Sequence, residues 1–294
     1  MIFPAALTGL SKVLKRLWVI KLKKIAVIND LSGFGKCSLS AAMPIISASG
    51  IQCCPLTTGV FSNQTGYESY KSVDFTEYLP SFIEQWRLLN PEFEAILTGF
   101  IPNSRQGKII SDFIKEFKTK NTLVVVDPVM GDDGRIYHCY DDESLKAVGE
   151  LVKSADVITP NLTELCILCC REYDRVAALE KDDMLKEIYQ MASSLGKTVI
   201  TTGIKFDGMV ANAVYADGGF DIVAAQMLGG GFSGTGDILS SIITSRLVNG
   251  DSCLNAVKVA TRFIETAIKL TLDNKDDRFN PADGICFEPL LKEL

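Results

Sequence analysis

The sequence predicts an α/β fold of three layers, in which helices cover both faces of a mostly parallel central sheet. From Lys24 to about residue 203, apolar β-branched runs alternate with amphipathic, helix-like segments. Short apolar strands separated by helices are typical of βαβ units with a buried parallel sheet. The pattern changes at 209–226, which is typical of a hairpin that turns at Asp217-Gly218-Gly219. Antiparallel strands are therefore expected at one edge of the sheet.

Each element is predicted from its own period. Strands are expected at 25–28, 52–61, 94–100, 122–129, 155–160 and 197–203. Helices are expected between them at 37–49, 74–89, 104–118, 144–153, 162–170 and 180–195, and two more at 235–249 and 251–272. No linker, repeat or low-complexity block divides the chain. We therefore expect one domain over residues 23–294, preceded by an extension.

The extension, residues 1–22, is apolar but interrupted by basic side chains, too often for a bilayer span. A signal peptide carries its positive charge before its apolar run, and here the order is reversed. An amphipathic surface helix and a mis-assigned start codon both stay open. We expect a cytoplasmic protein with no membrane partner.

Composition narrows the class of partner. The net charge of −6 and a pI near 5.0 provide no basic stripe for a nucleic-acid backbone, so a small molecule or a protein is the expected partner. Nine cysteines without a signal peptide indicate reduced thiols. Cys166, Cys169 and Cys170 lack a second pair of ligands nearby, so they are expected to be helix thiols, not zinc ligands.

In such a sheet, ligands bind beyond the carboxyl ends of the strands. The stretch NDLSGFGKCS after the first strand is not a P-loop, because Asp30 stands where the first glycine is needed. The best anion site is GGGFSGTGDILSS, residues 229–241, where glycines lead directly into a helix. The backbone N–H groups of residues 234–237 would point outward from that helix N-terminus and attract an anion.

Asp237 lies in the first turn of that helix and has two interpretations. It is a capping carboxylate that compensates the helix dipole, or a general base beside amides that stabilise a transferred phosphoryl group. A cap alone would not require the surrounding glycines, which favours the base.

Asp127 and Glu164 follow two neighbouring strands, in DPVMGDDG and TPNLTE. Carboxylate oxygens suit Mg²⁺, which keeps several waters and bridges to substrate phosphates. Asn161 and Glu164 also form the pattern of a capping box, and the two interpretations are compatible.

These motifs resemble a known family. GTGD at 234–237, DPVMGD at 127–132, TPNLTE at 159–164 and SNQTGY at 62–67 are similar, in this order, to the ribokinase superfamily and within it to the vitamin B6 kinases. The resemblance runs from about Lys24 to Leu272. It implies an αβα ribokinase-like fold, a cytoplasmic homodimer, and ATP-dependent phosphorylation of the 5′-hydroxymethyl group of pyridoxal, pyridoxine or pyridoxamine, with Mg²⁺ and an optional monovalent cation.

The resemblance also implies roles for individual residues. Asp237 is the expected catalytic base, with Gly234, Thr235 and Gly236 as the anion hole, and Asp127 and Glu164 lie near the metal. The expected nucleotide-binding residues are Asp132, Thr159, Asn161 and Thr202, and the expected vitamer-binding residues are Asp30, Phe61, Thr65 and Phe100.

Three positions depart from the family pattern. Serine, histidine and tyrosine are usual where this chain has Asp30, Gln64 and Phe100. Asp30 could pair with a cationic group, which favours pyridoxamine or pyridoxine over the aldehyde. Hydroxymethylpyrimidine kinase and a catalytically idle vitamer-binding protein are the alternatives, and a sugar kinase is less favoured because no lid insertion separates the first strands.

Two further features lie near the expected site. Lys36 and Lys205 are expected to be solvated, as most exposed lysines are. The loop at 130–143, rich in Gly and Asp, is expected to fold over bound substrate and exclude water.

Overall fold

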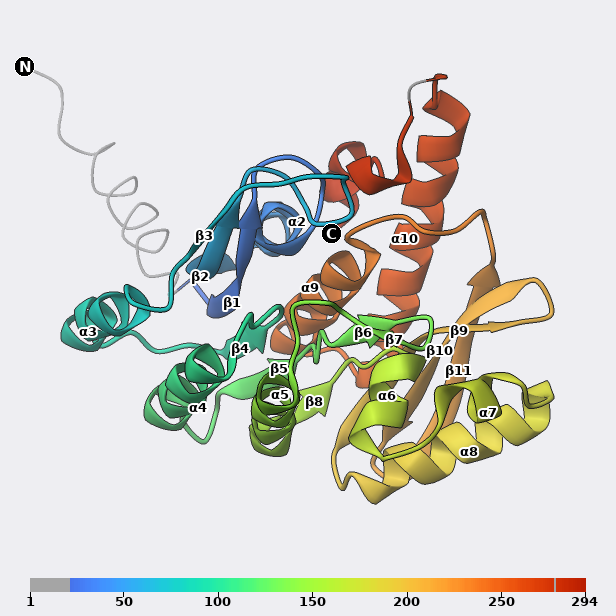
Figure 1. Ribbon diagram of the computed structural model, residues 1–294, viewed down its shortest axis with the longest axis horizontal. Coiled ribbons are helices and arrows are strands. Elements are labelled where there is room, and N and C mark those ends of the chain that lie inside the picture. Colours follow the sequence, from blue (N-terminus) through green and yellow to red (C-terminus); the bar gives the residue numbers. More distant parts are fainter. Residues whose placement is uncertain (1–21, 278) are drawn as a thin grey trace, which may run out of the picture.

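The structure is a computed structural model that describes residues 22–277 and 279–294. The predicted extension lies, apart from Leu22, outside the described residues. A nine-stranded sheet has the order β11-β10-β9-β8-β5-β4-β1-β2-β3 (Figure 1). Its parallel strands are β1 (Lys24–Ser32), β2 (Gln52–Phe61), β4 (Ala95–Thr98), β5 (Leu123–Val126), β8 (Val157–Ile158) and β9 (Thr198–Phe206). The predicted α/β fold with a mostly parallel sheet is confirmed.

The predicted hairpin forms one antiparallel edge of this sheet. Strand β10 (Met209–Ala216) pairs with β9 and with β11 (Gly219–Gln226). The turn is made by Asp217 and Gly218, both with positive φ, as a tight hairpin requires.

The opposite edge is also antiparallel, which the sequence did not predict. Strand β3 (Ser72–Asp74) pairs with β2, although a helix was predicted from residue 74. The Asp74 carboxylate accepts the backbone N–H of Thr76 at 2.6 Å and so turns the chain. Helix α3 (Leu79–Leu89) begins only afterwards, with Pro80 in its first turn, where the missing N–H costs nothing.

Helices cover both faces of the sheet (Figure 1). Along β1, Ala26 and Ile28 point into one apolar core and Ile25 and Val27 into the other, following the strand period of two. The first core is completed by α3, α4 (Ser104–Phe117), α5 (Asp142–Ser154), α6 (Leu162–Leu168), α7 (Tyr173–Ala177) and α8 (Lys181–Ser194). The second is completed by α2 (Ser38–Ala48), α9 (Thr235–Val248), α10 (Cys253–Asn274) and the 3-10 helix η2 (Glu288–Glu293).

Helix α6 is shorter than predicted. It ends at Leu168, and Cys170 adopts a positive φ of 53° just beyond it. Of the three cysteines expected to be helix thiols, Cys166 is buried, Cys169 half-buried and Cys170 exposed.

The remaining elements are short. A ribbon of β6 (Gly131–Asp132) and β7 (Arg135–Ile136) lies in the expected lid loop, and the 3-10 helix η1 (Pro281–Asp283) lies near the chain end. Within the described ranges, no helix combines the length and the apolar character that a membrane crossing requires.

The ladder of parallel strands brings the predicted site loops together. The N–H of Gly99 donates to Ile28 O at 2.8 Å, and that of Asp127 donates to Thr98 O at 2.9 Å. The N–H of Thr159 continues the series with Val126 O at 3.1 Å. The residues that follow β1, β4, β5 and β8 therefore line one edge of the sheet, as expected for a ligand site.

Candidate active site

Asp237 lies in the first turn of α9, where two segments meet its carboxylate. Nδ2 of Asn29, within β1, donates to Oδ1 of Asp237 at 2.9 Å, and the backbone N–H of Ser38 lies near this carboxylate. Burial raises the pKa of Asp237 to about 6, and the charge of Asp30 adds to the rise, while these two N–H groups oppose it. Such a carboxylate is ionised at neutral pH and basic enough to accept a proton from a hydroxyl.

Asn29 is a site residue to which the sequence analysis gave no role. Its Oδ1 accepts the backbone N–H groups of Asp30, at 3.0 Å, and Phe100, at 2.9 Å, while its Nδ2 holds Asp237. The amide is therefore fixed in orientation by three partners. The sequence offered one indication of this role: an asparagine directly after the buried strand predicted at 25–28, where a polar side chain needs a hydrogen-bond partner.

The N-terminus of α9 is open. Its N-cap, Gly234, has a φ of 78° and offers no capping side chain. The amides of Thr235, Gly236 and Asp237 donate to no acceptor within 22–277 and 279–294. A Cβ on Gly234 would lie 1.8 Å from the carbonyl oxygen of Lys36, so this glycine is required by both conformation and contact. Three free amides at a helix N-terminus can bind an anion.

The carboxylates of Asp127 and Glu164 both have a raised pKa, and the charge of Asp127 contributes to the rise at Glu164. Burial is the main cause at both residues, and it raises the pKa of Asp127 to about 8 with a further contribution from Asp237. Ser240 and Thr159 oppose the shift at Asp127; the Thr159 hydroxyl is near the carboxylate but outside strict hydrogen-bond geometry. A bound cation would lower the electrostatic repulsion between these carboxylates.

Glu164 is occupied by its own backbone neighbours. Oε1 accepts the N–H of Met130 at 3.0 Å and Oε2 that of Asn161 at 2.9 Å, so the predicted capping box is present. In the described part of the chain, no three His, Cys, Asp or Glu side chains are arranged to hold a metal. Asp127, whose Oδ2 faces Gly236 at the mouth of α9, is thus the better candidate for direct ligation, and Glu164 would act through water.

Three of the four expected nucleotide residues form one connected edge. Nδ2 of Asn161 donates to Gly131 O at 2.7 Å, next to Asp132. Asn161 also bridges to Thr202, whose N–H donates to Pro160 O at 2.8 Å. Thr159, the fourth, lies at Asp127. Lys205 is exposed, as expected, and it also pairs with Asp133 at 2.8 Å and brings a positive charge to this acidic edge.

The expected vitamer side is aromatic. Phe61 and Phe100 meet edge to face at 6.2 Å between ring centroids, and Thr65 is exposed nearby in sequence. Tyr140, from the expected lid loop, packs at right angles on Phe100 at 6.0 Å. The sequence analysis missed this contact because it joins segments forty residues apart.

Asp30 is buried and already paired. Its carboxylate accepts the hydroxyls of Ser38 at 2.6 Å and Ser32 at 3.0 Å, and burial raises its pKa above the ordinary value. A cationic substrate group would have to compete with these two hydroxyls.

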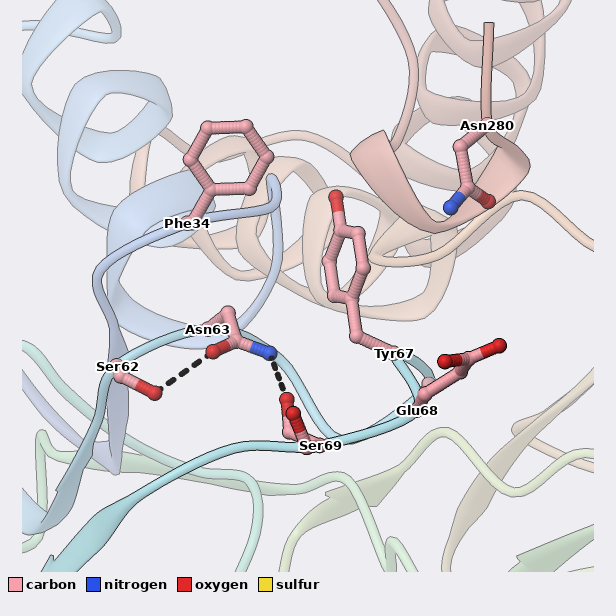
Figure 2. Close-up of a pocket in the computed structure, with 8 residues that line it drawn as sticks. Phe34, Ser62, Asn63, Tyr67, Glu68, Ser69 and Asn280 are labelled. Atoms are coloured by element: carbon pink, nitrogen blue, oxygen red, sulfur yellow. Dashed lines mark hydrogen bonds between the residues drawn. The ribbon is translucent and has the colours of Figure 1, made fainter. Parts of the chain in front are cut away.

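Beside the site lies an open hollow of about 560 Å³. In the view of Figure 2, Tyr67 lies between Phe34 on one side of this hollow and Asn280 on the other. Its lining is completed by Ser62, Asn63, Gly66, Glu68 and Ser69. Neither Asp237 nor Asp127 lines it, so the hollow borders the SNQTGY loop and not the acids.

Comparisons with known proteins identify the family and the fold. The family profile of phosphomethylpyrimidine kinase matches residues 39–282. A provisionally named phosphomethylpyrimidine kinase from Bacteroides thetaiotaomicron VPI-5482, crystallised with pyridoxal, is 39% identical with a TM-score of 0.86, covering 93% of this chain and 96% of that one. Pyridoxal kinase from Lactobacillus plantarum is 26% identical with a TM-score of 0.84, over 93% and 96% of the two chains.

A sequence relative has a longer chain. The thiamine biosynthetic bifunctional enzyme TH1 of Arabidopsis thaliana is 28% identical over 85% of this chain. This chain spans about half, 47%, of that relative's length.

Fold and site together define the class: a phosphotransferase with an alcohol group as acceptor. The chain belongs to the phosphomethylpyrimidine kinase family of the ribokinase superfamily, to which its vitamin B6 kinase relatives also point.

Proposed function

We propose that this protein transfers the γ-phosphoryl group of ATP to the 5′-hydroxymethyl group of a vitamin B6 vitamer. One observation carries the proposal: the Asp237 carboxylate, with its pKa raised to about 6, lies beside three free amides at the N-terminus of α9. A base and an anion hole in one turn of helix are what in-line phosphoryl transfer requires.

Each part of the site has a role in this proposal. Asp237 accepts the proton of the substrate hydroxyl, held in orientation by Asn29. The free amides of Thr235, Gly236 and Asp237, at the helix start that Gly234 leaves open, bind the transferred phosphoryl oxygens. Asp132, Thr159, Asn161 and Thr202 line the nucleotide phosphates. Mg²⁺, which Asp127 would hold directly and Glu164 through water, would neutralise charge on those phosphates.

The vitamer is proposed from a relative and from the aromatic pocket. The Bacteroides protein, 39% identical, was crystallised with pyridoxal. Phe61 and Phe100 supply apolar surface for a pyridine ring, and Thr65 lies on the adjoining loop. Because Asp30 is held by two serine hydroxyls, its charge gives less preference for pyridoxamine than the sequence suggested.

A substrate panel tests the proposal. Purified protein with ATP and Mg²⁺ is assayed against pyridoxal, pyridoxine, pyridoxamine and hydroxymethylpyrimidine. Turnover of at least one vitamer is expected, with Asp237→Asn reduced by about a hundredfold or more. Tight vitamer binding without turnover of any compound would contradict the proposal and favour an idle binding protein.

Hydroxymethylpyrimidine phosphorylation is the second candidate. It is favoured by the family profile over residues 39–282 and by the thiamine biosynthetic relative. Turnover of the pyrimidine alone would establish it.

A further inference from the structure

A segment near the chain end crosses three loops of the site. This segment, residues 279–288 and here named the strap, connects the region after α10 to η2. It contacts the β1–α2 loop at 33–37, the vitamer loop at 62–67 and the glycine loop at 229–236. In the view of Figure 2, Asn280 of the strap lies on the opposite side of Tyr67 from Phe34. None of the roles proposed above uses the strap.

The strap is hydrogen-bonded to the vitamer loop through two side chains. The Tyr67 hydroxyl donates to the Asp283 carboxylate. Nε2 of Gln64 donates to Ala282 O at 3.1 Å, and its Oε1 accepts the N–H of Gly66 at 2.6 Å. Gln64 is 7% exposed, and both polar atoms of its amide have a partner, one in the strap and one within the vitamer loop.

The strap also holds the glycine loop. The N–H of Ser233 donates to Pro281 O at 3.2 Å, and the rings of Phe232 and Phe279 pack at 6.1 Å. A Cβ on Gly284 would come within 3.3 Å of Ser233 O. Ser233 is the residue before Gly234, so the strap contacts the start of the proposed anion hole.

The third contact is with the β1–α2 loop. The two backbones run close together there, but the charged groups add little to stability. A Cβ on Gly35 would lie 3.2 Å from Ala282 O, which shows how near the two backbones run. Lys36 and Glu288 form a partly exposed ion pair at 2.9 Å, and such pairs add little.

We propose that the strap positions the vitamer loop and the glycine loop relative to each other, with Gln64 and Asp283 as positioning residues. The expected effect on turnover rests on the proposed function. The mechanical coupling of the two loops does not. Two loops that bind the two reacting groups are then held by one element. Precise placement of the reactants contributes a large part of the rate acceleration in phosphoryl transfer. Loosening the strap therefore weakens catalysis without removing a catalytic group. These contacts explain the glutamine at position 64, because its side chain connects the vitamer loop to the strap.

Amide hydrogen exchange of the full ligand-free chain tests the coupling. Gln64→Glu keeps the shape of the side chain but sets an oxygen against the Ala282 carbonyl, and Asp283→Ala removes the acceptor of Tyr67. Exchange of the Ser233 amide, whose N–H donates to Pro281 O, is expected to rise about tenfold in both variants, the size of one lost hydrogen bond, although neither changes the glycine loop. Tyr70→Phe, which removes a hydroxyl with no strap contact, is the matched control.

A rise confined to 62–67 and the strap would overturn the proposal. Should Asp283→Ala fail to fold, as a thermal melt would show, Tyr67→Phe removes only the hydroxyl of the same bond and decides the question.

Steady-state kinetics give the second readout. Gln64→Glu and Asp283→Ala are expected to raise the KM for the vitamer by about tenfold, and Asp283→Asn, which keeps an acceptor oxygen for Tyr67, is expected to restore most of it. Unchanged kinetic constants in both disruptive variants would also overturn the proposal. Wild-type protein that phosphorylates no vitamer would refute the proposed function instead, and hydrogen exchange would still decide the strap.

Discussion

Helices α6 and α9 each have one acid in the first turn, and they use it in opposite ways. At α6, Glu164 and Asn161 satisfy each other's backbone, and Glu164 is 3% exposed. At α9, Gly234 offers no side chain, the first amides stay free, and Asp237 points to Asn29 of another segment. A closed helix start stabilises the fold, whereas an open one can bind an anion. The same local pattern thus has a structural and a chemical form.

Substitution at the open helix should have the largest effect. In Asp237→Asn, Asn29 can still donate to the remaining oxygen, so the fold is kept while the base is lost. We expect turnover with ATP to fall by about a hundredfold to ten-thousandfold with little change in the KM for ATP. A loss below about tenfold would show that Asp237 is a cap like Glu164 and would remove the contrast between the helices.

Gly234→Ala should come next. The new Cβ would meet Lys36 O at 1.8 Å and take a positive φ, so we expect unfolding in urea to become easier by about 3 kcal/mol or more, with loss of turnover. Gly218→Ala is the matched control, since its φ of 79° is similar but nothing lies within 4 Å of its Cβ. It should cost about 1–2 kcal/mol. Equal costs would mean that the contact with Lys36 is unimportant.

Glu164→Gln tests the closed helix. One of the two buried N–H groups that Glu164 accepts would then face an NH₂ group, so we expect a loss of about 1–3 kcal/mol in the free energy of unfolding. Turnover should fall less than in Asp237→Asn. Glu143→Gln, in the first turn of α5 and exposed, should change stability by less than about 0.5 kcal/mol. A large rise in the Mg²⁺ requirement, with stability unchanged, would make Glu164 a direct ligand.

The smallest expected effect is on the pH dependence of stability, and it comes from Asp127. The folded pKa of Asp127, about 8, lies above its unfolded value, so the folded state binds more protons. This contribution is fully present below about pH 4 and is lost as the pH rises towards 8.

Without divalent cations, the melting temperature should therefore be a few degrees lower at pH 8 than at pH 5.5, and Mg²⁺ should restore part of it. Asp127→Asn should flatten the difference. If the melting temperature of the wild type rose over this pH range and that of Asp127→Asn did not, the raised pKa of Asp127 would be refuted.

Much of this contrast is visible in the sequence. TPNLTE predicted the capping box, and GTGD after a run of glycines predicted a helix start with outward-pointing amides, because both depend on neighbours within one turn. The start predicted at residue 74 for the helix now seen at Leu79–Leu89 was wrong, because the strand β3 and the turn at Asp74 depend on pairing with β2. Periodicity alone does not show such pairing.

The alternation of strands and helices follows from the sequence, and so does the sheet edge at which Asp127 and Thr159 meet. Local period and turn chemistry suffice for that. The contacts of Asn29 with Asp237 across 208 residues and of Gln64 with Ala282 across 218 arise only from tertiary packing. Packing also sets the raised pKa values, because burial depends on everything that surrounds a carboxylate. Contacts over such separations leave no period in the chain, and they are formed when the layers close on one another.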